Sequence, residues 1–186
     1  METSGYKHVL GIVGSPRRGG NTETLVDEVL AGAVEAGAEA AKATLRDLNI
    51  SPCKACNGCQ TIGKCVQDDD MKHVLKLMKK SDVWVLGTPI YWWGPTAQFK
   101  AFLDRWYGVD QSTFQGKRVI LAIPMGGGNS HYARHTVGMF EEICRYLGMD
   151  YVESIIATGM NGMGSVRESL NTIQNAREAG IRSVTY

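Results

Sequence analysis

The sequence has no long hydrophobic run and no excess of charge of either sign. Its apolar segments are shorter than the roughly 20 residues that a membrane-spanning helix needs, and residues 1–8 lack the apolar core of a signal peptide. Twenty basic residues stand against 19 acidic ones, a formal net charge of +1, which gives no field of one sign to attract a polyanion. We therefore expect a cytoplasmic protein that binds neither a membrane nor a nucleic acid.

Internal repeats, low-complexity tracts and Pro/Gly/Ser-rich linkers are also missing. The 186 residues are enough to bury one core, so we expect a single domain over residues 1–186. One long irregular stretch, at about 49–69, interrupts the regular pattern. A loop of this length inside a domain is usually either functional or disordered.

Short apolar runs alternate with amphipathic stretches along the chain. Runs typical of buried strands lie at residues 9–14, 83–87, 119–123 and 154–157, with a weaker, more polar candidate at 40–48. Apolar residues at helical spacing mark residues 22–36, 70–79, 96–107, 131–147 and 166–181. The alternation predicts an α/β fold, a three-layer sandwich with a five-stranded parallel sheet, in which ligands bind beyond the carboxyl ends of the strands.

The loop after the first predicted strand has the composition of an anion site. Residues 14–22 read GSPRRGGNT. The hydroxyls of Ser15 and Thr22, two arginines and the N–H groups at a helix N-terminus all favour a phosphate. The glycine patterns of P-loop NTPases and of Rossmann dinucleotide folds are both absent. The simpler alternative is an ordinary turn with Asn21 or Thr22 as the N-cap, which leaves the arginines unexplained.

Three consecutive aromatic residues follow the third predicted strand. Residues 88–96 read TPIYWWGPT. A flat ring system needs apolar walls for stacking and N–H groups where negative charge gathers on reduction. The alternative is that these aromatics fill the core or a subunit interface. The apolar residues of the following helix have helical spacing and are expected in the core or an interface, namely Phe99, Phe102, Leu103 and Trp106.

A glycine-rich loop, PMGGGN at residues 124–129, follows the fourth predicted strand. Without side chains, Gly126 and Gly127 could lie close to a planar ring. A flexible connection is the alternative, since glycine serves both purposes.

Four of the five cysteines form a compact C-x2-C-x2-C-x5-C motif at Cys53, Cys56, Cys59 and Cys65. This spacing is typical of [4Fe-4S] ligation, although the proline that follows the last cysteine of ferredoxin motifs is missing. A zinc site with four thiolates and a set of free or redox-active thiols remain alternatives. Cys144 lies in step with apolar neighbours on a predicted helix, which indicates a buried thiol without a chemical role.

The residues at 14–17, 20–22 and 89–105 together resemble the NADPH-dependent FMN reductase and iron-sulfur flavoprotein family, whose fold is flavodoxin-like. The resemblance implies that the FMN phosphate is held by Ser15, Arg17, Asn21 and Thr22. It implies flavin contacts at Pro89, Ile90, Tyr91, Trp92, Trp93, Gly94, Gly126 and Gly127. Family members carry such a cysteine motif between the second strand and second helix, its position here, which favours a cluster over zinc.

The resemblance also implies an activity. It indicates an FMN-dependent oxidoreductase that passes electrons through FMN and a [4Fe-4S] cluster, with NAD(P)H or ferredoxin as donor, no catalytic side chain, and a homodimeric or homotetrameric assembly. Two alternatives remain, namely a flavodoxin-like electron carrier that turns over no small molecule and a cluster-free NAD(P)H:FMN or quinone reductase. No motif in the sequence distinguishes NADPH from NADH.

Overall fold

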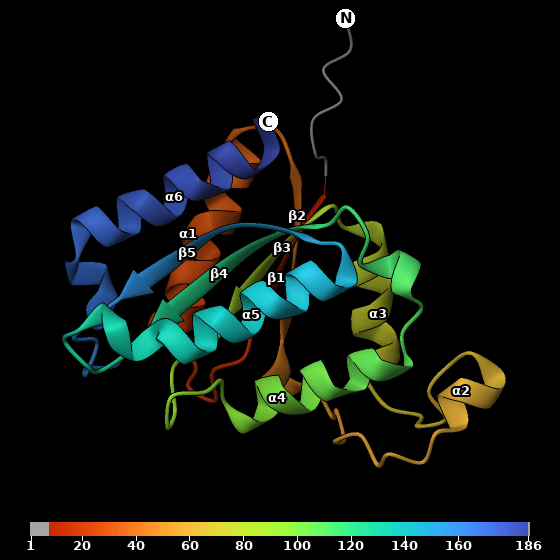
Figure 1. Cartoon of the computed structure of the whole chain (residues 1–186). Helices are drawn as coiled ribbons and strands as arrows, with labels where there is room; N and C mark the ends of the chain where they lie inside the picture. Colours follow the sequence, from red (N-terminus) through yellow and green to blue (C-terminus); the bar gives the residue numbers. More distant parts are fainter. Residues whose placement is uncertain (1–7, 186) are drawn as a thin grey trace, which may run out of the picture.

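The computed structural model describes residues 8–185, which contain one five-stranded parallel sheet. Its strands are β1 (His8–Val13), β2 (Glu39–Thr44), β3 (Val83–Gly87), β4 (Arg118–Pro124) and β5 (Asp150–Ala157). They lie in the order β2-β1-β3-β4-β5 (Figure 1), which is the flavodoxin-like order. The predicted fold is confirmed.

Helices pack on both faces of this sheet, and one short helix stands apart from it (Figure 1). They are α1 (Asn21–Glu35), α2 (Gly58–Ile62), α3 (Met71–Lys80), α4 (Ala97–Asp104), α5 (Arg134–Leu147) and α6 (Leu170–Thr185). One face packs against α1 and α6, and the other against α3, α4 and α5 (Figure 1). None of the helices within residues 8–185 has the length and apolar character needed to cross a membrane.

The central strand β3 shows why the apolar runs are nearly continuous. Trp84 and Leu86 point into the core under α3, α4 and α5, whereas Val83 and Val85 point into the core under α1 and α6. Both faces of the strand are buried, so an alternation of polar and apolar residues has no place here.

Helices α1 and α6 touch at the level of their backbones. A Cβ atom added to Gly32 would lie 1.9 Å from the carbonyl oxygen of Arg177, and one added to Gly180 would lie 2.0 Å from that of Val29. Any side chain at either glycine would force the helices apart. Across the same contact, Arg177 forms a 2.6 Å ion pair with Glu28.

Several element boundaries differ from the sequence-based expectation. The helix expected over 96–107 becomes 3₁₀ after Asp104, in the segment η2 (Arg105–Gly108). The helix expected over 166–181 is split into the 3₁₀ segment η5 (Ser165–Glu168) and α6, because Ser169 between them adopts a non-helical backbone conformation with φ of −89° and ψ of 78°. Within residues 8–185, strand β2 pairs with β1 alone. It ends at Thr44, four residues before the end of the expected range 40–48.

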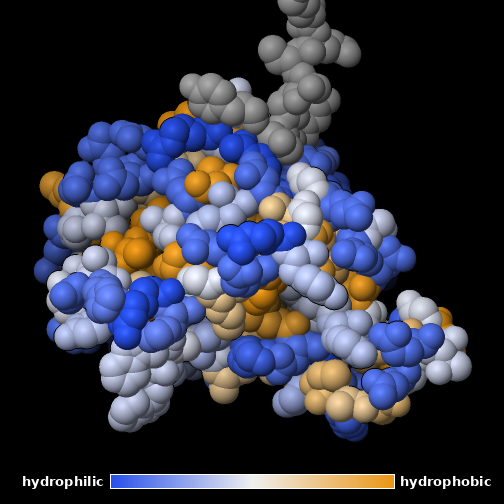
Figure 2. All heavy atoms as spheres, viewed as in Figure 1, coloured by the Kyte–Doolittle hydropathy of each residue, from blue (hydrophilic) through white to orange (hydrophobic). Residues whose placement is uncertain are grey.

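The cysteine motif lies in a segment that leaves the body of the molecule between β2 and α3. Its short helix α2 stands apart from the sheet in Figure 1. Hydrophobic and hydrophilic atoms are mixed on this projection in Figure 2, where Ile62 and Val66 are both exposed.

Candidate functional site

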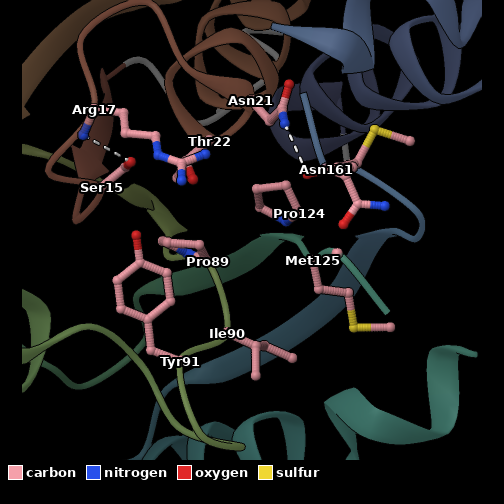
Figure 3. Close-up of a pocket in the computed structure, with 12 residues that line it drawn as sticks. Ser15, Arg17, Asn21, Thr22, Pro89, Ile90, Tyr91, Pro124, Met125 and Asn161 are labelled. Carbon is pink, nitrogen blue, oxygen red and sulfur yellow. Dashed lines mark hydrogen bonds between the residues drawn. The ribbon is translucent and has the colours of Figure 1, made fainter. Parts of the chain in front are cut away.

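The loops after β1, β3, β4 and β5 meet at the carboxyl end of the sheet and enclose a cavity of about 180 Å³. It is lined by Ser15, Arg17, Asn21, Thr22, Pro89, Ile90, Tyr91, Pro124, Met125, Gly126, Met160 and Asn161 (Figure 3). All four residues predicted to hold a phosphate therefore face the same space as the first half of the aromatic loop. This is the place where a parallel sheet of this topology binds ligands.

The loop after β1 lines the cavity with two hydroxyl groups and a guanidinium. Ser15 and Thr22 are buried, and the hydroxyl of Ser15 accepts a 3.2 Å hydrogen bond from the backbone N–H of Arg17. The exposed side chain of Arg17 extends over this turn toward Thr22 (Figure 3). Gly20 is the N-cap of α1 and no side chain caps the helix, so its first N–H groups can serve an anion.

Asn21 borders the cavity, but its side-chain amide forms hydrogen bonds with the backbone of the loop after β5. Its Nδ2 donates to the carbonyls of Gly162 (2.9 Å) and Met160 (3.3 Å), and its Oδ1 accepts from the N–H of Val166 (3.0 Å). Asn21 is thus not the N-cap of α1, and its side-chain amide is already hydrogen-bonded within the protein. It fastens the start of α1 to the loop after β5.

That loop, residues 158–164, supplies two lining residues that the motifs above do not identify, Met160 and Asn161. Asn161 approaches the glycine-rich loop closely, because a Cβ atom on Gly126 would lie 2.6 Å from its Oδ1. The signal that could find this loop is its composition, TGMNGMG, directly after the last strand. It is the same pattern of glycine after a strand that marks residues 124–129.

A partly buried carboxylate holds the loop after β1 in shape. Glu23 accepts hydrogen bonds from the N–H of Gly19 (2.9 Å) and from Arg46 (3.0 Å), with Lys42 at 3.4 Å. Burial acts to raise its pKa, but the hydrogen bonds from Arg46 and Gly19 and the charges of Arg46 and Lys42 together lower it to about 2. Arg46 also donates to the carbonyl of Arg17 (3.0 Å), which fixes the backbone beneath the guanidinium.

The aromatic loop contains a strained turn. Tyr91 and Gly94 exchange backbone hydrogen bonds of 2.9 and 3.1 Å. Trp92 and Trp93 lie between them with φ of 51° and 63°, a left-handed region that bulky residues rarely adopt and that costs about 1–3 kcal/mol per residue. Since Trp92 is 91% exposed and its two aromatic neighbours are about half exposed, these residues do not fill the core.

A second hollow of about 320 Å³ adjoins the cavity. It is lined by Ile90, Trp92, Trp93, Met125, Gly126, Gly127 and Tyr132. Ile90, Met125 and Gly126 border both spaces. Of the predicted flavin contacts, Gly94 lines neither space and serves to close the turn.

The four clustered cysteines surround one small pocket, with Arg105, Tyr107 and Gly108 of η2 on another side. All four thiols are free and at least partly exposed. Among residues 8–185, however, no three Cys, His, Asp or Glu side chains are close enough together to hold one metal ion. The four thiols thus surround one space, as the ligands of a zinc ion or of a [4Fe-4S] cluster do, without lying at ligating distance from one centre.

The fifth cysteine is inert. Cys144 is 1% exposed, and burial, with the charges of Asp150 and Glu141, raises its pKa to about 12. The prediction of a buried thiol is confirmed. The aromatic and apolar residues predicted for the core after the aromatic loop are also buried, namely Phe99, Phe102, Leu103 and Trp106.

Comparison with known proteins gives concordant results. An iron-sulfur flavoprotein of Methanocaldococcus jannaschii is 45% identical over 97 residues, 52% of this chain and 50% of the relative, so the match spans half of that protein's length. An iron-sulfur flavoprotein of Methanosarcina thermophila is 32% identical over 142 residues, 76% of this chain and 74% of the relative.

Among solved structures, the fold matches an FMN-dependent NADH-azoreductase of Bacillus anthracis in complex with FMN. The TM-score is 0.71 at 14% identity, and the match covers 95% of this chain and 99% of the azoreductase. The family model described as NADPH-dependent FMN reductase matches residues 8–162. These matches, together with the cavity at the carboxyl end of the sheet, show that the chain belongs to the NADPH-dependent FMN reductase family.

Proposed function

We propose that the chain is an FMN-dependent oxidoreductase whose FMN phosphate binds at the loop after β1 and whose flavin ring lies against the aromatic loop. The observation that carries this proposal is the shared cavity. Ser15, Arg17 and Thr22 face the same space as Ile90 and Tyr91, so phosphate donors and apolar walls stand at the two ends of one site.

The side chains have separate tasks in this proposal. The hydroxyls of Ser15 and Thr22 and the guanidinium of Arg17 orient the phosphate, while Pro89, Ile90 and Tyr91 form the wall on which a ring can stack. When bound, FMN supplies both two-electron and one-electron redox chemistry. Trp92 and Trp93 border the adjoining hollow, where they would exclude water from a second reactant such as NAD(P)H.

We extend the proposal to a [4Fe-4S] cluster held by Cys53, Cys56, Cys59 and Cys65. Two observations support it, namely that all four thiols line one pocket and that several relatives are named iron-sulfur flavoproteins.

NAD(P)H and a ferredoxin-type protein are the candidate electron donors. The aromatic loop, with its exposed Trp92, would lie at a subunit interface in a homodimer or homotetramer, which light scattering at micromolar concentration tests.

A cluster-free NAD(P)H-dependent FMN or quinone reductase is the second candidate. It is favoured by the spacing of the four thiols, which in residues 8–185 form no group able to hold a metal ion. A flavin carrier without turnover is distinguished from both by NAD(P)H oxidation with an added acceptor, since only the enzymes consume NAD(P)H catalytically.

The decisive experiment is a visible spectrum of anaerobically purified protein with analysis of FMN, iron, sulfide and zinc. We expect about one FMN, about four iron and about four sulfide per chain. Cys59→Ser should lose the iron and keep the FMN, whereas Cys144→Ser should keep both because Cys144 lies in the core. Protein with FMN but no iron would leave the cluster-free reductase, and protein without FMN would refute the proposed site.

A further inference from the structure

A single arginine joins the two ends of the cysteine segment. The guanidinium of Arg105 donates from Nη1 to the carboxylate of Asp69 (2.5 Å) and to the carbonyl of Ser51 (2.9 Å), and from Nη2 to the second oxygen of Asp69 (3.1 Å). Ser51 precedes the first cysteine and Asp69 follows the last. The ion pair is buried, with 1% of the Arg105 side chain and 5% of the Asp69 side chain exposed.

Further hydrogen bonds join the two ends of this segment beside the arginine. The N–H of Ser51 donates to Asp69 (3.1 Å), the N–H of Asn49 donates to the carboxylate of Asp70 (2.7 Å), and the N–H of Asp70 donates to the carbonyl of Asn49 (3.1 Å). The two ends are therefore fixed to each other and, through Arg105, to the end of α4.

The same 3₁₀ segment forms one side of the cysteine pocket. Arg105 lines that pocket together with Cys65 and the other three cysteines of the motif. A Cβ atom on Gly108 would lie 3.3 Å from the Cβ atoms of both Cys59 and Cys65, so η2 packs against them with its backbone.

One donor of Arg105 is left over. Its Nε is buried and has no hydrogen-bond partner, although both Nη atoms are used. A buried donor without an acceptor is unfavourable and rare in native proteins. The acceptors that line this pocket beside Arg105 include the cysteine sulfurs.

We propose that Arg105 is the positioning residue of the cysteine pocket: it clasps both ends of residues 51–69 and donates its free Nε–H to sulfur at Cys65 when the pocket is filled. The clasp stands on the hydrogen bonds alone, whereas the donation rests on the cluster of the proposed function. A positive donor beside the sulfurs stabilises the more negative, reduced state of a cluster and so raises its reduction potential.

The clasp is tested on metal-free full-length protein by hydrogen exchange. Arg105→Gln should speed amide exchange within 51–69 by about tenfold or more and leave β1 and β3 unchanged. Arg105→Lys keeps the charge but loses the two-pronged contact, so it should exchange at an intermediate rate and provides a second variant if Arg105→Gln does not fold. Lys64→Gln is the control, since Lys64 is exposed next to Cys65. Wild-type exchange rates in both Arg105 variants would overturn the clasp.

The donation is tested by redox titration of iron-loaded protein. Arg105→Gln should shift the midpoint potential of the cluster to more negative values, by more than Lys64→Gln does, because exposed charge is screened by solvent. An unchanged potential in Arg105→Gln would refute the donation. Wild-type protein that takes up no iron would refute both the cluster and the donation, while hydrogen exchange still decides the clasp.

Discussion

The hydroxyl of Thr96 donates a 2.5 Å hydrogen bond to the backbone carbonyl of Gly14. Gly14 begins the loop after β1, and Thr96 ends the aromatic loop, so this bond joins the two loops that border the cavity. The hydroxyl oxygen of Thr96 also accepts a 3.2 Å hydrogen bond from the N–H of Phe99, so Thr96 is the N-cap of α4. Thr96 is 1% exposed, which keeps water from competing for either bond.

Thr96→Val keeps the shape of the side chain and removes both hydrogen bonds. We expect it to lower the free energy of unfolding by about 1–3 kcal/mol and to weaken FMN binding, because the two loops are no longer held together. Denaturant unfolding and fluorescence titration with FMN measure the two effects. Thr185→Val is the control, since its hydroxyl is exposed and bonds only within α6. Wild-type stability and affinity in Thr96→Val would contradict this role.

Arg17→Ala tests the placement of the phosphate. We expect FMN affinity to fall by about 1.5–3 kcal/mol, roughly 10- to 150-fold, with little change for riboflavin, which has no phosphate. Arg18→Ala is the matched control, because Arg18 forms an ion pair with Asp47 and does not line the cavity. Equal affinities of the wild-type protein for FMN and riboflavin, or unchanged FMN affinity in Arg17→Ala, would contradict this placement of the phosphate.

Glu23 predicts a loss of stability in acid. Its folded pKa of about 2 lies below the ordinary value of 4.5, so the unfolded chain binds more protons between these values. The stabilisation is fully present above about pH 5 and is lost as the pH falls toward 2. Glu23→Gln should therefore cost at most roughly 2–3 kcal/mol at pH 7 and progressively less on acidification. Urea unfolding over this range tests it, and a difference that does not vary with pH would exclude the assigned cause.

The turn at Trp92 predicts a gain in stability on mutation. Asparagine adopts the left-handed region more readily than tryptophan, and Trp92 is 91% exposed in the single chain, so little packing within the monomer is lost and the effect is measured at protein concentrations where the chain is monomeric. Trp92→Asn should raise the free energy of unfolding by about 1 kcal/mol while lowering the rate of acceptor reduction. Tyr146→Asn is the control, because Tyr146 is 81% exposed on a regular helix. A decrease in stability would show that the turn is not strained.

The position of the site could be predicted from the sequence because it follows from local patterns. Buried strands are read from continuous apolar runs, and the loops after them must meet at one edge of a parallel sheet. The composition of these loops and the family resemblance together point to Ser15, Arg17, Ile90, Tyr91 and Gly126, and all of them line the cavity.

Two of the remaining features depend on contacts between distant residues, and a third is a local turn formed by unusual residue types. Asn21 reads as a cap or a phosphate ligand, since nothing local reveals that the loop at 160–166 takes its amide. Trp92 and Trp93 are not the asparagine and glycine residues that usually mark such a turn, so sequence patterns do not predict it. The partner of Arg105 lies 36 residues away along the chain, and helical spacing does not identify it.

The hydrogen-bonded contact between Ser51 and Asp69 makes the cysteine segment an insertion whose two ends are adjacent. Its ends already meet, through hydrogen bonds between residues 49–51 and 69–70, so a short turn can bridge them without moving β2 or α3. Insertions with adjacent ends are the kind that a fold tolerates best. A change in the length of this segment between the same two ends therefore leaves the cavity at the sheet edge in place, so we expect the cysteine segment and the cavity to vary independently.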